Sequence, residues 1–329
     1  MIGIALINEC IKNNVEVLAI VRRQSTHLCR LPESDLVKIF ECNLNELHTI
    51  TDVKKKYDVF YHFAWDHTSK ENRDNPILQE YNIKYTLDAV MLAKRLGCHK
   101  FIGAGSQAEY GRVDSIITPD TDVKPVISYG IAKYAAGELS GKLCRQQGMI
   151  HIWGRVFSVY GRYDNEGTML VYAIDQFLKG ETAKFSSATQ LWDYLHEDDA
   201  GKIFYLIGQC IENDQVYCIA SGRSKPLKDF ILELKDIFGS AAKCEFAEKT
   251  DEGSLISLQA DIRTLIEDIE FTPQTMFRKG IEDMVQYRKQ ILGGGQKLNP
   301  NGSCSFAFMQ PKKNNENGDE VKIERRRAA

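Results

Sequence analysis

Long apolar runs are absent from this sequence of 329 residues, and so is a basic segment followed by an apolar one at its start. The first absence argues against membrane-spanning helices, and the second gives no indication of a secretion leader. An excess of one charge is also missing, because 42 Lys and Arg residues stand against 45 Asp and Glu residues. The net charge of −3 gives no electrostatic reason to expect nucleic-acid binding. We therefore expect neither a membrane nor a nucleic acid as partner.

Cysteine pairs at metal-binding or redox spacing are absent as well. The nine cysteines are scattered singly, and no CxxC motif occurs. Reduced thiols buried in a cytoplasmic protein explain this distribution better than disulfides or a zinc site. The hydrophobic fraction of 43% and the charged fraction of 26% are typical of a globular protein with a sizeable core. We expect a cytoplasmic protein without a bound metal.

Short β-branched, apolar runs alternate with helical patterns up to about Arg155. A strand buried on both faces of a parallel sheet is apolar almost throughout, as Val15–Val21 is. The same reasoning predicts strands at Leu36–Phe40, Tyr57–Phe63, Lys100–Ala104 and Ile150–Val156, and helices at Ala5–Asn13, Glu46–Lys55, Ile77–Leu96 and Tyr129–Gln147. Because parallel strands require helical crossovers, this alternation predicts a doubly wound α/β sheet over residues 1–161.

The pattern changes after Gly161. Helical patterns separated by short, irregular strands occur at Met169–Lys179, Asp198–Gly208, Leu227–Phe238 and Pro273–Lys289. They predict a smaller α+β lobe at 162–290, interleaved with the first domain and covering the carboxyl ends of its strands. Residues 291–329 are rich in Gly, Asn and charge, with too few apolar residues to offset the entropy of ordering. We expect a disordered tail there and assign it no function.

The start of the chain departs from the usual order of a doubly wound nucleotide-binding fold. Such a fold opens with a central strand and a Gly-rich turn that meets the pyrophosphate at a helix N-terminus. Here Met1-Ile2-Gly3 already corresponds to the end of that turn, with Gly3 as its last glycine. We expect a sheet that lacks its first strand. Since a natural protein of this kind would expose unpaired edges in mid-sheet, a truncated start is the favoured explanation.

The strongest chemical motif is Ser128-Tyr129-Gly130-Ile131-Ala132-Lys133, at the start of a predicted helix. Residues four apart project from one helix face, so the Tyr129 phenol and the Lys133 amine lie together. A free phenol has a pKa near 10, and a nearby ammonium group lowers it toward neutrality. The pair is thus a means of making a proton donor and acceptor usable near pH 7. Taken alone, such a pair is more often a solvated helix face.

Ser106 strengthens the functional interpretation. It follows the strand that begins at Lys100, and the carboxyl end of a parallel strand is where a doubly wound sheet places its ligand contacts. A turn or helix-capping serine is the common alternative. Ser106, Tyr129 and Lys133 together, after a strand–helix alternation, favour a catalytic site.

With these motifs, the chain resembles the extended short-chain dehydrogenases/reductases, the NAD-dependent epimerase/dehydratase group, from Gly3 to Tyr287. The matching segments are Asp58–Trp65, Asn82, Gly105–Gly111, Tyr129–Lys133, Arg155–Gly161, Trp192–Asp199 and Pro273–Tyr287. The resemblance implies a Rossmann-type sheet and a nicotinamide cofactor. It also implies that Tyr129 is the general acid/base, that Ser106 orients the reacting oxygen, and that Lys133 lowers the phenol pKa and holds the nicotinamide ribose.

The resemblance further implies two sets of binding residues. The cofactor set comprises Gly3, Arg22, Phe63, Ala64, Trp65, Asn82, Tyr129 and Lys133. The substrate set comprises Gln107, Tyr160, Arg162 and Trp192. An acidic residue after the second strand selects NAD in such folds, whereas Arg22-Arg23 stands there in this chain, which favours NADP over NAD. Two arginines at a solvated strand end are the alternative.

Departures from the family pattern narrow the expected reaction. The 4,6-dehydratases carry an Asp-Glu pair directly after the catalytic hydroxyl residue, and this chain has Gln107-Ala108 with Glu109 one position later. Many epimerases have a diphosphate-binding arginine where this chain has Trp192, and Arg162 or Arg155 is a possible substitute. His196-Glu197-Asp198-Asp199 suggests a metal cluster, but acids at a helix start, where they complement the helix dipole, are the better explanation.

We expect an NAD(P)-dependent sugar-nucleotide epimerase or 4-keto-sugar reductase. A non-catalytic nucleotide-binding protein of the same fold is the alternative, since fold does not dictate function, and a 4,6-dehydratase is disfavoured. The resemblance also implies a homodimer formed through the helices at Ile77–Leu96 and Tyr129–Gln147.

Overall fold

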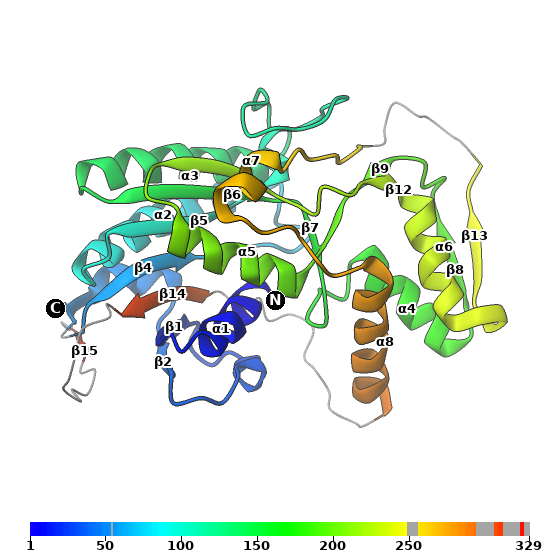
Figure 1. Ribbon diagram of the computed structural model, residues 1–329, viewed down its shortest axis with the longest axis horizontal. Helices are drawn as coiled ribbons and strands as arrows, with labels where there is room; N and C mark the ends of the chain where they lie inside the picture. The colour runs from blue at the N-terminus through cyan, green and yellow to red at the C-terminus, as the bar shows by residue number, and fades with distance from the viewer. Residues whose placement is uncertain (54, 249–255, 294–305, 312–322, 326–329) are drawn as a thin grey trace.

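The computed structural model describes residues 1–53, 55–248, 256–293, 306–311 and 323–325. Its centre is a seven-stranded sheet with helices on both faces (Figure 1). The strand order is β11 (Gln215–Ile219), β6 (Ile150–Val156), β5 (Lys100–Ser106), β4 (Tyr57–His62), β14 (Phe306–Pro311), β1 (Val17–Val21) and β2 (Val37–Glu41). The pairs β11–β6, β6–β5, β5–β4 and β1–β2 are parallel, which confirms the predicted doubly wound α/β sheet.

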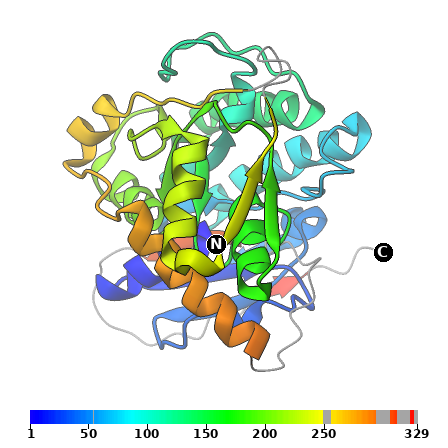
Figure 2. The ribbon, with the colours of Figure 1, turned by 90° about the vertical axis from the view of Figure 1, so that its right-hand side faces the viewer.

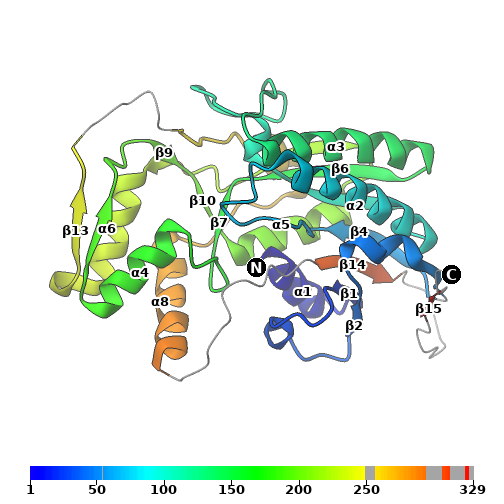
Figure 3. The ribbon, with the colours of Figure 1, turned by 180° about the vertical axis from the view of Figure 1, so that it is seen from behind.

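Two hydrophobic layers attach the helices to the sheet. Helices α1 (Ile2–Lys12) and α5 (Glu197–Cys210) pack through Leu6, Ile7, Ile203 and Phe204. Helices α2 (Pro76–Arg95) and α3 (Ser128–Gln146) lie side by side, and Ala89, Leu92 and Cys144 belong to the second layer (Figure 3). The observed bounds of all four helices lie close to the predicted ones. Among the described residues, no helix is both long enough and apolar enough to cross a membrane.

The place of the expected first strand is occupied. As expected, the chain contains no strand before α1. However, β14 lies between β4 and β1 and pairs antiparallel with both, with Ala307 opposite Ile20 and His62. The inner edges of β1 and β4 are therefore paired, and the expected open edges are not present.

Parts of the predicted disordered tail are ordered elements. Residues 291–293 complete helix α8 (Phe277–Gly293), 306–311 form β14, and β15 (Ile323–Arg325) pairs antiparallel with β3 (Ile50–Val53). The prediction of a disordered tail is wrong for these residues, and the rest of 291–329 lies outside the described residues. The partners of both strands are more than 200 residues away in sequence, a distance at which local composition carries no information.

The predicted helix at Glu46–Lys55 is also wrong. The chain forms a short 3₁₀ turn at Leu44–Thr49, capped by Asn43, and then enters β3. Thr49, Ile50 and Thr51 are all β-branched, and such residues favour extended backbone over helix. The extended backbone that these residues favour therefore replaces the helix that the strand–helix alternation predicted.

The second lobe lies beside the carboxyl ends of the sheet strands (Figures 1 and 2). Its helices are α4 (Met169–Lys179), α6 (Leu227–Phe238) and α8, and its strand pair is β8 (Thr182–Phe185) with β13 (Lys243–Phe246). Three smaller elements connect the lobe to the sheet: β7 (Ser158–Tyr160) with β10 (Tyr194–His196), β9 (Leu191–Trp192) with β12 (Lys225–Pro226), and α7 (Arg263–Ile269). Elements α5, β11 and α7 return to the sheet after the chain has entered the lobe.

Candidate active site

Strand β5 delivers Ser106 to the carboxyl edge of the sheet. The strand ends in a tight turn in which the Ser106 Oγ accepts a hydrogen bond from the Ala108 N–H at 3.2 Å. The Glu109 carboxylate accepts a bond from the Ser106 N–H at 2.7 Å. This reciprocal cap fixes the backbone of Ser106 and leaves its side chain 7% exposed. The turn-capping and catalytic interpretations of Ser106 are therefore compatible, since it caps the turn and also meets Tyr129.

Helix α3 carries Tyr129 and Lys133 to the same place. Tyr129 is half-buried, whereas Lys133 is buried and donates to the Ala104 carbonyl at 2.7 Å. The Lys133 Nζ lies 3.7 Å from the centre of the Trp65 indole and 5.8 Å from the centre of the Tyr129 ring. Tyr129 and Trp65 meet edge to face, with centroids 5.9 Å apart. The predicted catalytic residues thus converge with one of the predicted cofactor residues.

The electrostatics of the phenol differ from the sequence prediction. Removal from water raises the pKa of Tyr129, while the positive charge of Arg73 and a hydrogen bond from Ser106 act in the opposite direction. Burial lowers the pKa of Lys133 to about 7, because the ammonium form is poorly solvated there. The cation that lies against the phenol is Arg73, with its guanidinium carbon 4.3 Å from the ring centre.

Sequence reasoning missed Arg73. It lies in the polar loop between β4 and α2, and the sequence of that loop does not distinguish Arg73 from an arginine that faces solvent. Two contacts attach the loop to the start of α3: the Tyr129 N–H donates to the Arg73 carbonyl at 2.9 Å, and the Ser128 N–H donates to the Asp74 carboxylate at 2.9 Å. Only the tertiary structure brings this arginine to the tyrosine.

A buried polar layer supports the site from within the domain. Glu109 is fully buried, and its carboxylate accepts from the Arg155 guanidinium at 2.8 Å and from the Trp153 indole N–H at 3.0 Å. Burial raises the pKa of Glu109, and the charge of Arg155 opposes that shift. Arg155 also donates to the Pro119 carbonyl at 3.0 Å. Arg155 is therefore part of the interior, and it does not lie where it could replace the missing diphosphate-binding arginine.

Three glycines surround the Trp153 ring. A Cβ atom on Gly103 would lie 2.2 Å from that ring, one on Gly105 would lie 2.3 Å from its nitrogen, and one on Gly137 would lie 2.8 Å from it. Real Cβ atoms do not approach other atoms so closely. Only glycine therefore fits at these positions of strand β5 and helix α3 while the Trp153 indole packs between them.

A cavity of about 180 Å³ lies at the carboxyl ends of β1 and β2. Ile20 and Arg22 line it from β1 and the residue after it, and Ala64 lines it from the segment after β4. The lining is largely apolar, with Arg22 and Asp66 as its charged residues, which fits the adenosine end of a dinucleotide. Arg22 and Arg23 have different surroundings, because the Arg23 guanidinium pairs with Glu46 at 2.9 Å.

The other predicted cofactor residues have varied surroundings. Gly3 is buried in the first turn of α1, and Phe63 contacts Phe204 edge to face at 4.8 Å. The Trp65 N–H donates to Gln79 at 2.9 Å. The Asn82 side-chain amide makes two hydrogen bonds to the backbone of Asp66: it accepts from the Asp66 N–H at 2.7 Å and donates to the Asp66 carbonyl at 3.1 Å. Its observed role is to hold the loop that lines the cavity.

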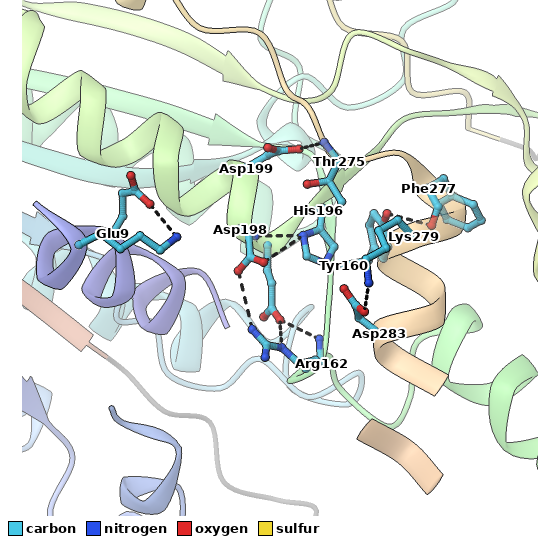
Figure 4. A network of polar contacts seen from close by, with 12 residues as sticks. Glu9, Tyr160, Arg162, His196, Asp198, Asp199, Thr275, Phe277, Lys279 and Asp283 are labelled. Carbon is cyan, nitrogen blue, oxygen red and sulfur yellow. Dashed lines mark hydrogen bonds and ion pairs between the residues drawn. The ribbon is translucent and has the colours of Figure 1, made fainter. Parts of the chain in front are cut away.

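The predicted substrate residues differ in their burial. Gln107 is half-buried next to Ser106, and Trp192 is half-buried in β9. Tyr160 is 1% exposed, and its hydroxyl donates to the Phe277 carbonyl at 3.3 Å (Figure 4). The structure therefore places Tyr160 in the core of the second lobe, away from any surface that a substrate could reach.

Arg162 lies at the junction of the two lobes (Figure 4). Its side chain is 42% exposed and pairs with the buried Glu197 at 3.3 Å and with Asp198 at 3.8 Å. The His196 Nδ1 accepts from the Asp198 N–H at 3.3 Å, so His196 caps α5, and three acids occupy the first turn of this helix. This confirms the prediction of a helix start at His196–Asp199.

The comparisons with known proteins agree with this geometry. A family model described as the NAD dependent epimerase/dehydratase family matches residues 1–220. The dTDP-4-dehydro-6-deoxyglucose reductase of Escherichia coli is 23% identical over 261 residues, which cover 74% of this chain and 78% of the relative.

Two solved structures show the similarity in fold. The UDP-N-acetylglucosamine 4-epimerase from Methanobrevibacter ruminantium, in complex with UDP-N-acetylmuramic acid, has a TM-score of 0.77 at 20% identity, with 88% of this chain and 94% of that chain covered. The UDP-glucuronic acid 4-epimerase from Bacillus cereus, in complex with NAD, has a TM-score of 0.75 at 20% identity, with 90% and 96% covered. At these identities, the two structures support the fold alone.

Proposed function

The chain belongs to the NAD dependent epimerase/dehydratase family, and from this premise we propose that it transfers hydride at a carbon of a nucleotide-linked sugar, as an epimerase or a 4-keto-sugar reductase. The observation that carries the proposal is the position of the Tyr129 phenol, between the Ser106 hydroxyl and the Arg73 guanidinium at the carboxyl edge of the sheet. Carboxyl edges of doubly wound sheets are where ligands bind.

Each residue of the site has a role in this chemistry. Tyr129 takes the proton of a sugar hydroxyl during oxidation and returns it during reduction. Ser106 orients the reacting oxygen, and Lys133 holds the nicotinamide ribose. The bound nicotinamide supplies or accepts the hydride. Trp65 is buried and its ring lies against both Lys133 and Tyr129, so it excludes water from this side of the phenol.

The position of Glu109 argues against the dehydratase. Eliminating water requires an acid and a base that reach the substrate, in addition to the tyrosine. Glu109 is fully buried, and its oxygens are occupied by Ser106, Trp153 and Arg155. It is therefore a structural carboxylate, and elimination has no acid on this turn.

We propose that residues 1–161 bind the cofactor and that 162–290 form the substrate-binding lobe. Arg22 lines the adenosine cavity and favours NADP over NAD, because a cation there complements a 2′-phosphate. The relatives leave the reaction open between the two candidates, since one is named a reductase and the solved structures are epimerases. We propose that Gln107, Arg162 and Trp192 bind the nucleotide of the substrate.

The test is an assay of the purified protein against nucleotide-linked sugars and their 4-keto-6-deoxy derivatives. Loss of nicotinamide absorbance with a 4-keto sugar and NADPH indicates the reductase. Conversion of one sugar epimer to another without net cofactor change indicates the epimerase. Ligand binding without either reaction supports the non-catalytic alternative and overturns the proposal.

We also propose a homodimer formed through α2 and α3. These neighbouring helices expose large apolar side chains on their outer faces, namely Ile77, Tyr81, Met91, Ile131 and Leu139. Such side chains gathered on adjoining helices favour an interface. Light scattering distinguishes the outcomes: the wild type elutes with twice the mass of a variant carrying Leu139→Glu, and equal monomer masses contradict the dimer.

A further inference from the structure

We infer that Arg73 is a catalytic residue of this site, which stabilises the anionic form of Tyr129 and thereby sets the pH at which the phenol can accept a substrate proton. The chemistry rests on the function proposed above. The contact between the two side chains, however, exists whatever the substrate is.

The fold fixes Arg73 from both sides along the chain. Asn75 caps α2, with its side-chain oxygen accepting from the Ile77 and Leu78 N–H groups at 3.1 and 3.2 Å. Before it, the Asn72 carbonyl accepts from the Gln79 amide at 3.2 Å. Because residues on either side of Arg73 are anchored to α2, the loop has little freedom to carry the arginine elsewhere.

The same loop is also attached to the helix that carries the tyrosine. The Ser128 hydroxyl donates to the Asp74 carboxylate at 3.0 Å, and the Ser128 N–H donates to it at 2.9 Å. One residue further on, the Tyr129 N–H donates to the Arg73 carbonyl at 2.9 Å. Arg73 thus meets Tyr129 through both its backbone and its guanidinium, which lies 4.3 Å from the ring centre. A cation that merely faced solvent would have neither contact.

Three charged groups face the phenol, and they come from three different elements. Arg73 comes from the loop before α2, Glu109 from the turn after β5, and Lys133 from α3 itself. The charge of Glu109 raises the pKa of Tyr129, and the charge of Arg73 lowers it. Lys133 has a pKa of about 7, lowered by burial, so it loses its charge above neutrality. A guanidinium keeps its charge throughout this range, so Arg73 is the cation that remains beside the phenol.

Arg73 also retains an unused donor. Its Nε is buried and has no hydrogen-bond partner among the residues that the structure describes. A buried N–H without a partner is unfavourable, and an oxygen of a bound ligand would satisfy it. When the sugar hydroxyl passes its proton to the phenolate oxygen, the guanidinium is within the same cluster of groups and loses no proton itself. Arg73 therefore acts through charge and hydrogen bonding alone.

The first test measures the ionisation of Tyr129 without substrate or cofactor. Trp65 lies 5.9 Å from the phenol, and a phenolate quenches indole fluorescence, so alkaline titration reports on Tyr129. The fluorescence change that Tyr129→Phe abolishes belongs to this residue. Replacing Arg73 by Met is expected to move its midpoint upward by about one to three pH units, the usual effect of losing a nearby opposite charge. In Arg73→Lys, which keeps a positive charge, the midpoint is expected to return most of the way to the wild-type value. Thermal melts establish that each variant is folded.

Lys70→Met is the matched control, because it removes a positive charge from an exposed position of the same loop. Its midpoint is expected to stay at the wild-type value. An Arg73→Met midpoint equal to that of the wild type overturns the inference.

The second test follows the pH profile of kcat/KM for sugar oxidation. Its acidic limb is expected to move to higher pH in Arg73→Met, whereas a purely structural role would lower the rate at every pH and leave the limb in place. The two tests fail separately. If no nucleotide-linked sugar is turned over but the fluorescence midpoint moves, the proposed function is wrong, and what stands is that Arg73 stabilises the anionic form of Tyr129.

Discussion

The two halves of the central sheet are built differently. Strands β4, β5, β6 and β11 are mutually parallel and follow one another in chain order. Strands β1 and β2 form a second parallel pair, and among the described strands it is the antiparallel β14, from the far end of the sequence, that pairs this half with the first. The proposed proton-transfer residues belong entirely to the first half.

The proposed cofactor cavity, in contrast, spans the junction. Ile20 and Arg22 line it from the second half, and Ala64 lines it from the end of β4. The difference implies that the proposed proton transfer depends on the first half alone, whereas the proposed cofactor contacts draw on both halves. Perturbations of the first half are expected to change catalysis, and perturbations of β14 are expected to change cofactor affinity and stability.

The largest effect is expected for Tyr129→Phe. Loss of the phenolic hydroxyl removes the proposed acid/base, and such a group typically contributes about 10²- to 10⁴-fold to the rate. Because the ring and its contact with Trp65 remain, the Kd for the cofactor is expected to change little. Tyr134→Phe, a half-buried tyrosine on the same helix, is the control and is expected to retain full turnover. If the Tyr129 variant turned over substrate as fast as the control, Tyr129 would not be the general acid/base.

Glu109→Ala is expected to destabilise the first half strongly. It leaves the buried Arg155 without its carboxylate, and breaking a buried ion pair in this way costs roughly 3–5 kcal/mol. Urea denaturation measures the loss. The amide of Glu109→Gln can still accept from Ser106 and Trp153, so this variant is expected to lose less. Equal losses in the two variants would show that the charge of Glu109 is not what matters.

Phe308→Pro tests the junction between the halves. Proline removes a backbone donor from a central strand that is paired on both sides, and a lost buried hydrogen bond costs about 1–3 kcal/mol. Phe308→Ala keeps the N–H and is the control, so the difference between the two isolates the backbone pairing. Lower melting temperature and weaker cofactor binding are expected for proline relative to alanine. Identical behaviour of the two would mean that β14 contributes nothing to the junction.

For Lys133→Met we expect a change in stability that depends on pH. The folded protein releases the Lys133 proton near pH 7, whereas an unfolded lysine keeps it until about 10.5. Between these values the unfolded state binds more protons, so the stability contributed by this group rises with pH. At pH 6 the wild type carries the full cost of a buried ammonium, and the methionine variant does not.

The stability advantage of Lys133→Met is therefore expected to be largest at pH 6 and to shrink above pH 7, by at most about 1.4 kcal/mol per pH unit. Denaturation curves at pH 6 and pH 9 measure it. An advantage that grows with pH would contradict the assignment of a lowered pKa to Lys133.

Sequence reasoning succeeded where a local pattern decides the structure. Apolar runs such as Val17–Val21 and Ile150–Val156 are strands because both of their faces are covered, and the spacing of Tyr129 and Lys133 follows from helix geometry. It failed where the partner is remote. The contact of Arg73 with Tyr129 depends on how one loop meets another helix, and the pairing of β14 depends on strands at the opposite end of the chain.

Burial was the other quantity that the sequence did not provide. Tyr160 and Glu109 stand within motifs that suggest contact with a ligand, yet one lies in the core of the second lobe and the other beneath Ser106. A motif shows which residues lie close in sequence to the candidate site. The packing of neighbouring elements decides which of those residues point into the site.

The indole of Trp153, enclosed by Gly103, Gly105 and Gly137, has a consequence for how this protein can evolve. A larger residue at any of the three glycines is excluded while the tryptophan is present, and a smaller residue at 153 leaves a void that only larger neighbours fill. The four positions should therefore covary among relatives. A chimera that receives β5 from one relative and β6 from another should fold only when the bulky ring and its small neighbours are inherited together.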